Sequence, residues 1–457
     1  MTNRKIALIG AGSIAWGATL IRDLSDTQDL KGSTVVLMDV NQERLSLMYR
    51  LAKRYVQEVK SDIRVEHTSD RREAIRDADF VINTAMHGGH QYYEKMRSIS
   101  EEYGYYRGIN SVEWNMVSDY HTIWGYHQFK LALEIARDVE DWAPNAWLLQ
   151  VANPVFELTT LIGRETKAKV IGLCSEAYSY KSVAKMLGLE GEVQAKMIGV
   201  NHDAWLVEFK HGGEDAYPLL DDWISKNYQR HVESYFQRSR EEPLNVYLSP
   251  VAFDMYRNYG LFPVGDVVRS GTWKYHWDFG TKRRWYGEYG GFDSELGWME
   301  YLRRHEEVTN LLVRAVDSQS PLSPLLRGGG GGEKDVVVPV IDSIANDKGE
   351  VHTVNVLNLG ALQGVGDDVA VEIPAKVDAK GVHRGSYSLP KRVLNLAIRP
   401  RVQRMEVAME AFLEGGRQPL FDWLISDPRT DSVRQVEGVI DALLSIPENS
   451  ELAKHFR

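Results

Sequence analysis

The segment Lys5-Ile-Ala-Leu-Ile9-Gly10-Ala-Gly12-Ser13-Ile-Ala15 decides the fold of this chain. Its first five residues form an almost continuously apolar run that ends at a glycine, which is typical of a buried parallel strand. The spacing that follows is G-x-G-x-x-A. The first glycine allows a tight turn, the second lets a diphosphate approach the backbone, and Ala15 lets a helix pack closely on the strand. The segment therefore predicts a strand–turn–helix unit that binds a dinucleotide at Gly10, Gly12 and Ser13, by the helix N-terminus.

A second apolar run, Val35–Met38, ends at Asp39, which lies 27 residues after Gly12. Near this distance in dinucleotide-binding folds, a carboxylate binds the hydroxyls of the adenosine ribose. An acid at this position favours NAD over NADP because it would repel a 2′-phosphate. In the alternative interpretation, Asp39 caps a helix beside Asn41. The glycines before Asp39 favour cofactor binding.

The apolar pattern predicts an α/β fold for the first part of the chain. Further strand-like runs follow at residues 79–83, 147–151, 170–174 and 196–209, and an amphipathic helix is expected over residues 43–60. After these runs the alternation of strands and helices stops. We therefore expect an N-terminal Rossmann-like doubly wound sheet over residues 1–200, followed by an α+β catalytic and oligomerisation domain over residues 201–457.

The C-terminal half combines helices with antiparallel strands. Helices are expected at 217–237, at 388–415 with an interruption near Pro400, and at 430–444 as the terminal helix; strands are expected at 351–358 and 368–374. Residues 260–291 are expected to be rich in loops. Residues 328–332 are five consecutive glycines, which predict a mobile loop because glycine loses the most conformational freedom when it is ordered.

The overall composition is that of a soluble globular protein. Of the 457 residues, 43% are hydrophobic and 26% charged, and the net charge is −10. The acidic balance argues against a nucleic-acid binder, which needs a basic face. One cysteine excludes an intrachain disulfide framework. Neither a signal peptide nor an apolar run of membrane-spanning length is evident, so we expect a cytoplasmic protein without membrane contact.

The segment 103–145 interleaves aromatic and hydrogen-bonding side chains. It includes Tyr105, Tyr106, Asp119 and His121. Such a pattern suits a carbohydrate, with rings beneath the sugar and polar groups at its hydroxyls. A packed helix that is partly exposed is the alternative, because Tyr and Trp also suit cores and interfaces.

Three polar residues belong to the predicted strands in the middle of the chain or follow them. Asn153 follows the run 147–151 and precedes a proline, which forces it out of the helical conformation and can aim its amide at a ligand. Cys174 ends the run 170–174, and His202 is carried by the run 196–209. Taken alone, one cysteine and one histidine are a poor metal signal, because a buried cysteine usually acts as a small hydrophobe.

These motifs, taken together, resemble glycoside hydrolase family 4, and most closely its α-glucosidase and α-glucuronidase branch. The resemblance extends over nearly the whole chain and rests on Gly10-x-Gly12-Ser13, Asn153-Pro154, Gly172-x-Cys174 and Gly199-Val-Asn-His202. Closer matches to that branch are Val81–Met86, Tyr103–Gly108, Asn115–Tyr120, Asp254–Arg257, Gly265-Asp266, Trp273–His276 and Asp427–Thr430.

The resemblance implies an NAD- and Mn2+-dependent glycosidase, since this family is an exception to the two-carboxylate mechanism of most glycosidases. The sugar C3 hydroxyl is oxidised, the C2 proton is removed, and the aglycone leaves by elimination. Water then adds at C1 and C3 is reduced again. NAD is regenerated in each cycle, so the overall reaction is hydrolysis of an α-glucoside or α-glucuronide.

The resemblance also implies roles for single residues. Cys174 and His202 would hold the metal; ligand softness alone would favour Zn2+ or Fe2+, so Mn2+ rests on the resemblance. Asp266 corresponds to the base that removes the C2 proton, and Asp119 to a second carboxylate that assists the leaving group. Asn153 and Asn201 are expected to bind substrate. If the family motif is set aside, each aspartate would be interpreted as a surface ion pair or a turn cap.

Two further positions bear on sugar specificity. Ser175 stands where related members usually have histidine, so substrate binding and proton transfer at this point differ from those relatives. Glu176 is a candidate to take over part of that task. Arg269, three residues after Asp266, suits a sugar carboxylate because guanidinium binds carboxylates through two parallel hydrogen bonds. A structural ion pair is the equally weighted alternative.

Other functions are compatible with parts of the pattern. The chain is alternatively an NAD-linked dehydrogenase of a sugar or hydroxy acid, an α-galactosidase or α-galacturonidase with the same mechanism, or a non-catalytic NAD-binding protein. The expected partners are a small carbohydrate substrate and further copies of the chain in a homodimer or homotetramer, as the resemblance suggests.

Overall fold

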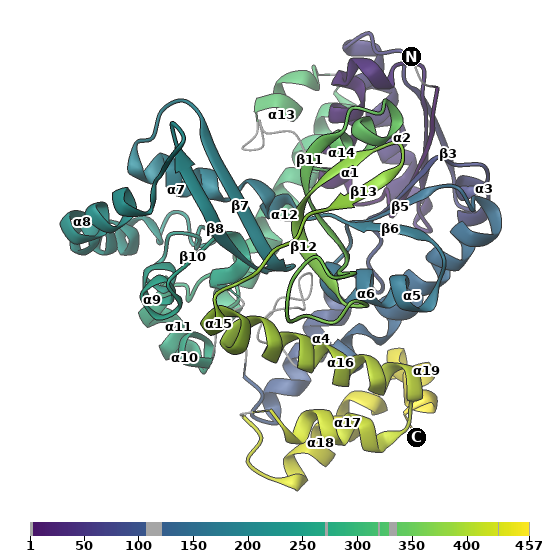
Figure 1. Cartoon of the computed structure of the whole chain (residues 1–457). Coiled ribbons are helices and arrows are strands. Elements are labelled where there is room, and N and C mark those ends of the chain that lie inside the picture. Colours follow the sequence, from purple (N-terminus) through teal and green to yellow (C-terminus); the bar gives the residue numbers. More distant parts are fainter. Residues whose placement is uncertain are drawn as a thin grey trace.

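A single mixed sheet organises the molecule. The structure is a computed structural model that describes residues 3–106, 121–269, 273–318, 320–328, 336–427 and 429–456. Within these residues, thirteen strands form one sheet in the order β10-β8-β7-β12-β11-β6-β5-β4-β1-β2-β3, with β13 beside β12 and β9 beside β8. Figure 1 shows the strands from the N-terminal half on one side of the molecule and the long β7–β8 arm on the other.

The N-terminal half of the sheet is parallel. Its strands lie in the order β3-β2-β1-β4-β5-β6, which is the order of doubly wound dinucleotide-binding folds. Their bounds are β1 (Lys5–Ile9), β2 (Thr34–Met38), β3 (Arg64–Thr68), β4 (Phe80–Asn83), β5 (Trp147–Gln150) and β6 (Lys169–Gly172). The predicted Rossmann-like sheet is confirmed.

Amphipathic helices cover this parallel sheet. They are α1 (Ile14–Asp26), α2 (Gln42–Glu58), α3 (Arg71–Ile75), α4 (Gly89–Glu102), α5 (His121–Trp142) and α6 (Val155–Glu165), with the 3-10 helix η1 (Gln28–Leu30) after α1. In α2, Leu45, Met48, Ala52 and Val56 recur at helical spacing and are buried. Because helices cover the sheet, the strands between them are apolar along nearly their whole length.

Antiparallel strands extend the same sheet beyond β6. They are β11 (Glu350–Leu357), β12 (Ala370–Asp378), β13 (Gly381–Arg384), β7 (Val193–Val200), β8 (Asp203–His211), β9 (Glu214–Asp215) and β10 (Phe262–Pro263). The two predicted C-terminal strands pair with each other as expected. β11 joins β6 through the pair Asn355 and Gly172, and β12 joins β7 through Glu372 and Gly199. The expected division at residue 200 falls between β7 and β8, two neighbouring strands of one hairpin.

The prediction of one long strand over residues 196–209 is wrong. Residues 201 and 202 form a turn between β7 and β8, and the chain reverses there. His202 has a φ of 59°, in the left-handed region, and a Cβ at Gly199 would lie 2.1 Å from the carbonyl oxygen of Asp203. The turn itself contains no Gly or Pro, so the apolar pattern gave no signal to divide the strand.

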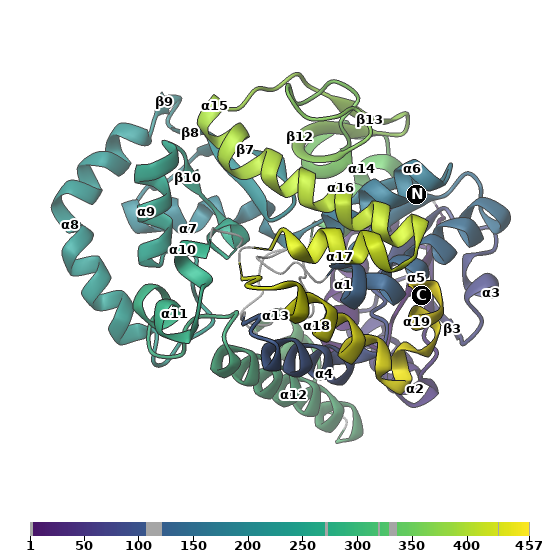
Figure 2. The ribbon, with the colours of Figure 1, turned by 90° about the horizontal axis from the view of Figure 1, so that it is seen from below.

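The remaining helices gather around the antiparallel strands and along the side of the sheet seen in Figure 2. They are α7 (Tyr180–Leu187), α8 (Tyr217–Arg238), α9 (Pro250–Tyr259), α10 (Trp273–His276), α11 (Phe279–Tyr286), α12 (Glu295–Asp317), α13 (Ser323–Gly328), α14 (Val337–Ala345), α15 (Lys391–Val393), α16 (Arg399–Glu414), α17 (Arg417–Ile425), α18 (Val433–Ser445) and α19 (Ser450–His455), with the short helices η2 (Ser175–Tyr178), η3 (Gly265–Val268), η4 (Leu394–Ile398) and η5 (Pro447–Asn449).

Two further expectations change in detail. The helix predicted to be terminal is α18, and α19 follows it because Pro447 begins a new 3-10 turn after the first helix ends. The segment 260–291 contains η3, α10 and α11 as well as loops. The interruption expected near Pro400 is a π-helical turn, η4, directly before α16.

Some expectations fall outside the structure. The five-glycine segment lies beyond the described residues except for Gly328, and so does Asp119. Among the described helices, none combines the length and the hydropathy needed to cross a membrane.

Candidate functional site

The glycines of the first turn are required by close backbone and side-chain contacts. Gly10 has a φ of 90°, and a Cβ there would lie 2.6 Å from both Cα and N of Ala85. A Cβ at Gly12 would lie 2.6 Å from Oδ2 of Asp39. Ser13 occupies the N-cap position of α1, where its side chain makes no capping bond. This turn therefore leaves the N-terminus of α1 without a side-chain cap, in the arrangement that suits an anion.

Asp39 is tied to the same turn. The Gly12 amide donates to Oδ2 of Asp39 at 2.8 Å, and the Asn41 amide donates to Oδ1 at 2.8 Å. The side chain that caps α2 is Asn41, which accepts a hydrogen bond from the Arg44 amide. Asp39 is thus not the cap of α2 and stands between the glycine turn and the end of β2.

Cys174 and His202 meet although they come from separate segments. Cys174 lies two residues after the end of β6, His202 lies in the β7–β8 turn, and Sγ of the first is 3.4 Å from Nε2 of the second. Burial lowers the pKa of His202 to about 4, because a charged imidazole loses its hydration there, and this outweighs the opposing effect of Asp266. His202 is therefore neutral at pH 7, the form in which imidazole binds metals.

Asp266 lies on the other side of the His202 ring. It belongs to the 3-10 helix η3, and its Oδ2 is 3.6 Å from Nδ1 of His202. Arg269 donates to Oδ1 of Asp266 at 2.8 Å and forms a second ion pair with Asp293. Three predicted site residues, Cys174, His202 and Asp266, thus form a continuous row in this structure.

The environment of Arg269 favours one of its two interpretations. Its side chain is buried, with 3% exposed, and two carboxylates already accept from it. Its guanidinium also lies 4.0 Å from the centre of the Phe292 ring. This geometry supports the structural ion pair over recognition of a sugar carboxylate.

The three remaining described candidates have different surroundings. Asn201 is fully buried and donates from Nδ2 to Oε2 of Glu372 at 2.8 Å. Asn153 is half-buried after β5, and its Oδ1 accepts from the Val155 amide at 3.3 Å. Ser175 is exposed at the start of η2. Because β5 and β6 are parallel neighbours, Asn153 and Cys174 follow adjacent strand ends, as the doubly wound arrangement predicts.

Sequence reasoning missed a group of buried carboxylates around this row. Glu372 could have been noticed, since it is the only charge in the apolar run Val369–Pro374 of the predicted strand. Asp203 directly follows His202, accepts from Nε1 of Trp205, and has its pKa raised to about 6, chiefly by burial. Asp293 gave no signal, because only the fold brings it to Arg269.

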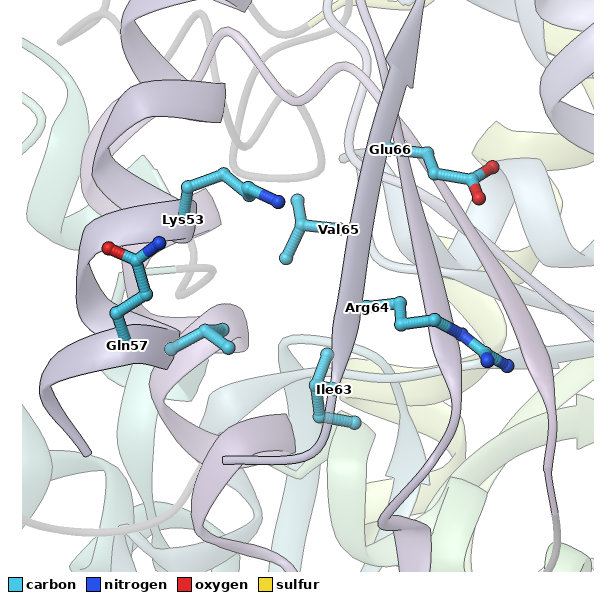
Figure 3. A pocket seen from close by; sticks show the side chains of 7 residues that line it. Lys53, Gln57, Ile63, Arg64, Val65 and Glu66 are labelled. Carbon is cyan, nitrogen blue, oxygen red and sulfur yellow. The ribbon is translucent and has the colours of Figure 1, made fainter. Parts of the chain in front are cut away.

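Figure 3 shows a pocket that lies away from these residues. It has a volume of about 310 Å³ and is lined by Lys53, Val56, Gln57, Ile63, Arg64, Val65 and Glu66. These residues belong to α2, to β3 and to the segment between them, and β3 is the last strand at the opposite end of the sheet from β10. The pocket contains none of the candidate site residues.

Comparison with known families accounts for almost the whole chain. The family described as "Family 4 glycosyl hydrolase" matches residues 5–189, and "Family 4 glycosyl hydrolase C-terminal domain" matches residues 197–430. The chain belongs to family 4 of the glycosyl hydrolases. The resemblance inferred from the sequence is thereby confirmed.

Comparison with individual relatives does not decide which sugar the chain acts on. An α-glucosidase of Erwinia rhapontici is 24% identical, over 96% of this chain and 97% of the relative. An α-galactosidase of Bacillus subtilis is also 24% identical, over 96% of each chain. A crystal structure of a 6-phospho-α-glucosidase from gut microorganisms, in complex with NAD and Mn2+, has a TM-score of 0.77 at 18% identity and covers 98% of both chains. The structural likeness confirms the fold class, and the different names of the relatives leave the sugar open.

Proposed function

We propose that this family 4 protein hydrolyses α-glucosides or α-glucuronides with NAD and a divalent metal, Mn2+, as cofactors. The observation that supports the proposal most is the row of Cys174, His202 and Asp266, with 3.4 Å between thiol and imidazole and 3.6 Å between imidazole and carboxylate. The family resemblance gives these three residues roles in the same reaction, and their proximity agrees with it. A related structure holds NAD and Mn2+.

The residues fit both cofactors. The turn with Gly10 and Gly12 leads into a helix N-terminus without a side-chain cap, which suits a diphosphate. Asp39 places a carboxylate beside this turn, which suits the adenosine ribose. For the metal, Sγ of Cys174 and Nε2 of His202 lie 3.4 Å apart, so a thiolate and a neutral imidazole would be available to hold one divalent ion. Among the described residues, no group of three His, Cys, Asp or Glu surrounds a metal position.

Each side chain then has a task in the reaction. When bound, NAD supplies a hydride acceptor for C3 and Mn2+ supplies positive charge at the sugar oxygens. Cys174 and His202 hold the metal, and the neutral His202 keeps its lone pair available because burial disfavours protonation. Asp266 removes the C2 proton, and the electron pair left on C2 forms a double bond to C1 as the aglycone departs. Water adds its oxygen at C1 and a proton at C2, which restores the sugar once C3 is reduced.

Other parts of the site concern substrate choice. Asn153, after β5, is proposed to bind a sugar hydroxyl. Asn201 is also proposed to bind substrate, in addition to its hydrogen bond to Glu372. Asp119, the proposed aid to the leaving group, lies outside the described residues. Ser175 in place of the usual histidine is the position at which sugar preference is expected to differ from that of relatives.

The test is hydrolysis of p-nitrophenyl α-glucoside and α-glucuronide by the purified protein, with NAD, Mn2+ and a thiol reductant supplied together or omitted one at a time. The galactosidic analogues belong in the panel because an α-galactosidase is as similar as the α-glucosidase. Nitrophenol release that needs all three additions supports the proposal. Accumulation of NADH without nitrophenol would point to a dehydrogenase instead, and NAD binding without any turnover would point to a non-catalytic protein.

Two further expectations belong to the same proposal. We propose a cytoplasmic protein that assembles as a homodimer or homotetramer. Light scattering coupled to size-exclusion chromatography should then give a mass of about two or four times 52.0 kDa. A mass equal to one chain at assay concentration would contradict the oligomer.

A further inference from the structure

A row of buried ionisable groups continues beyond the three residues of the proposed site. Behind His202 and Asp266 follow Arg269 and Asp293, and each of the four is at most 4% exposed. Nδ1 of His202 is 3.6 Å from Asp266, Asp266 is 2.8 Å from Arg269, and Arg269 is 2.9 Å from Asp293. The row therefore links the metal-binding side of the site to the segment just before α12.

Asp293 determines the orientation of the Arg269 guanidinium. Nε of Arg269 donates to Oδ2 of Asp293 at 3.0 Å, and Nη2 donates to Oδ1 at 2.9 Å. These two parallel bonds fix the plane of the guanidinium. The remaining nitrogen, Nη1, is directed at Oδ1 of Asp266 at 2.8 Å. Since Oδ1 of Asp266 is held in this way, Oδ2 is the oxygen that faces His202.

The position of Asp293 is itself well supported. Lys282, which is fully buried on α11, donates from its ammonium to the Asp293 carbonyl oxygen. The Phe292 ring lies under the Arg269 guanidinium at 4.0 Å. Lys282 and Arg269 contribute two positive charges and Asp266 and Asp293 two negative charges, so the formal charges of these four buried residues sum to zero. Charge balance of this kind allows ionised groups to remain inside a protein at an acceptable desolvation cost.

We propose that Asp293 is a positioning residue for the glycosidase reaction, and that it acts through Arg269 to hold the Asp266 carboxylate beside His202, in the place from which Asp266 is proposed to remove the C2 proton. This inference rests on the proposed function, in which Asp266 is the base. It also agrees with the structural interpretation of Arg269, because each of its three nitrogens already donates to Asp266 or Asp293.

The variant Asp293→Asn tests the inference. It keeps the size of the side chain but places an NH2 group against the guanidinium, so one of the two parallel bonds is lost and Arg269 gains freedom. A displacement of about 1 Å at a reacting group is enough to lower a rate by up to about a hundredfold. We expect kcat to fall between about 10- and 100-fold, while KM for the glycoside and the affinity for NAD change less than about twofold.

A kinetic readout separates positioning from loss of folded protein. Substrates deuterated at C2 or at C3 report how far each bond cleavage limits the rate. If Asp293→Asn slows proton removal, the ratio of the C2 to the C3 isotope effect on kcat rises above its wild-type value. If Asp293 only supports the fold, kcat falls with the folded fraction and the ratio stays at its wild-type value, which would overturn the inference.

Two more variants complete the design. Asp138→Asn is the matched control, because Asp138 is a buried carboxylate bound by Arg71 and Arg72 on α3, away from the proposed site; it should leave the ratio unchanged. Arg269→Lys keeps the charge but cannot form the two parallel bonds, and should reproduce the raised ratio even if Asp293→Asn fails to fold. Absence of cofactor-dependent hydrolysis by the wild type would instead refute the proposed function, before any variant is compared.

Discussion

The contact between Gly12 and Asp39 gives the sharpest test of the proposed dinucleotide site. In Gly12→Ala the new Cβ would lie 2.6 Å from Oδ2 and 2.9 Å from Cγ of Asp39, and 3.2 Å from Cβ of Arg44. The two shortest contacts are with the rotatable Asp39 carboxylate, whereas Cβ of Arg44 is fixed to its backbone and has to give by a few tenths of an ångström. The Asp39 carboxylate has to move away, and the 2.8 Å bond from the Gly12 amide is weakened or lost.

The magnitude follows from that bond. A hydrogen bond to a charged group contributes about 1.5–3 kcal/mol, and Asp39 is half-buried, so a folding cost of about 1–2 kcal/mol is expected. For a protein of this size that corresponds to a fall in Tm of about 1–2 °C. The displaced carboxylate should also lose its bonds to the ribose, at a similar cost per bond, which predicts NAD binding weaker by about 10- to 100-fold.

Isothermal titration of NAD and thermal unfolding measure the two effects on the same sample. Gly10→Ala is the useful contrast, because its Cβ would meet the Ala85 backbone at 2.6 Å with a φ of 90°, so its defect should appear mainly in folding. Gly280→Ala, in helix α11 and with an ordinary 3.4 Å contact, is the control; it should leave NAD affinity unchanged and raise stability slightly, because Ala has the higher helix propensity. Retention of wild-type NAD affinity in Gly12→Ala would refute the role given to Asp39.

Three further predictions concern buried polar groups. The pKa of His90 is lowered to about 4, chiefly by burial, so as pH falls through 6.5 the unfolded chain takes up this proton before the folded chain does and stability is lost. In His90→Gln the loss in unfolding free energy between pH 7.5 and 5.5, measured by urea unfolding, should therefore be about 1 kcal/mol smaller than in the wild type. Arg401→Met removes the cation beside the buried Glu157 carboxylate and should cost about 3–5 kcal/mol, most of it recovered when Glu157→Gln is added. No recovery in the double variant would contradict the pairing. Glu372→Ala removes the acceptor of Asn201 and should cost about 1–3 kcal/mol, whereas Glu372→Gln, which keeps an acceptor, should cost clearly less in the same assay.

The parts that could be predicted from the sequence follow from periodicity and from one motif of fixed spacing. The apolar run Lys5–Ile9, the glycines after it and an acid 27 residues beyond Gly12 are such a motif, so residue types and spacing predict the parallel sheet and its first turn. The β7–β8 turn was missed because the residues on both sides of Asn201 and His202 continue a strand-like apolar pattern. Asn is a common turn residue and His202 adopts a left-handed conformation, but one such pair without Gly or Pro did not outweigh that pattern.

The supporting residues of the site could not be predicted, because their roles arise from contacts between distant positions. Asp293 reaches Arg269 across 24 positions, and Glu372 reaches Asn201 across 171. A single sequence contains no periodicity that links such positions. Arg269 shows the consequence: its type suits a sugar carboxylate, and only the fold shows that two aspartates already occupy it.

Replacement of the single cysteine tests the central claim most directly. Cys174→Ser keeps the shape of the side chain and removes the thiolate that, with His202, is proposed to hold the metal, while the region of Gly10, Gly12 and Asp39 is untouched. With NAD, Mn2+ and reductant present, we predict that hydrolysis of the preferred p-nitrophenyl glycoside is lost and that NAD affinity stays within about twofold of wild type. Full activity in Cys174→Ser would contradict the metal site and, with it, the mechanism proposed here.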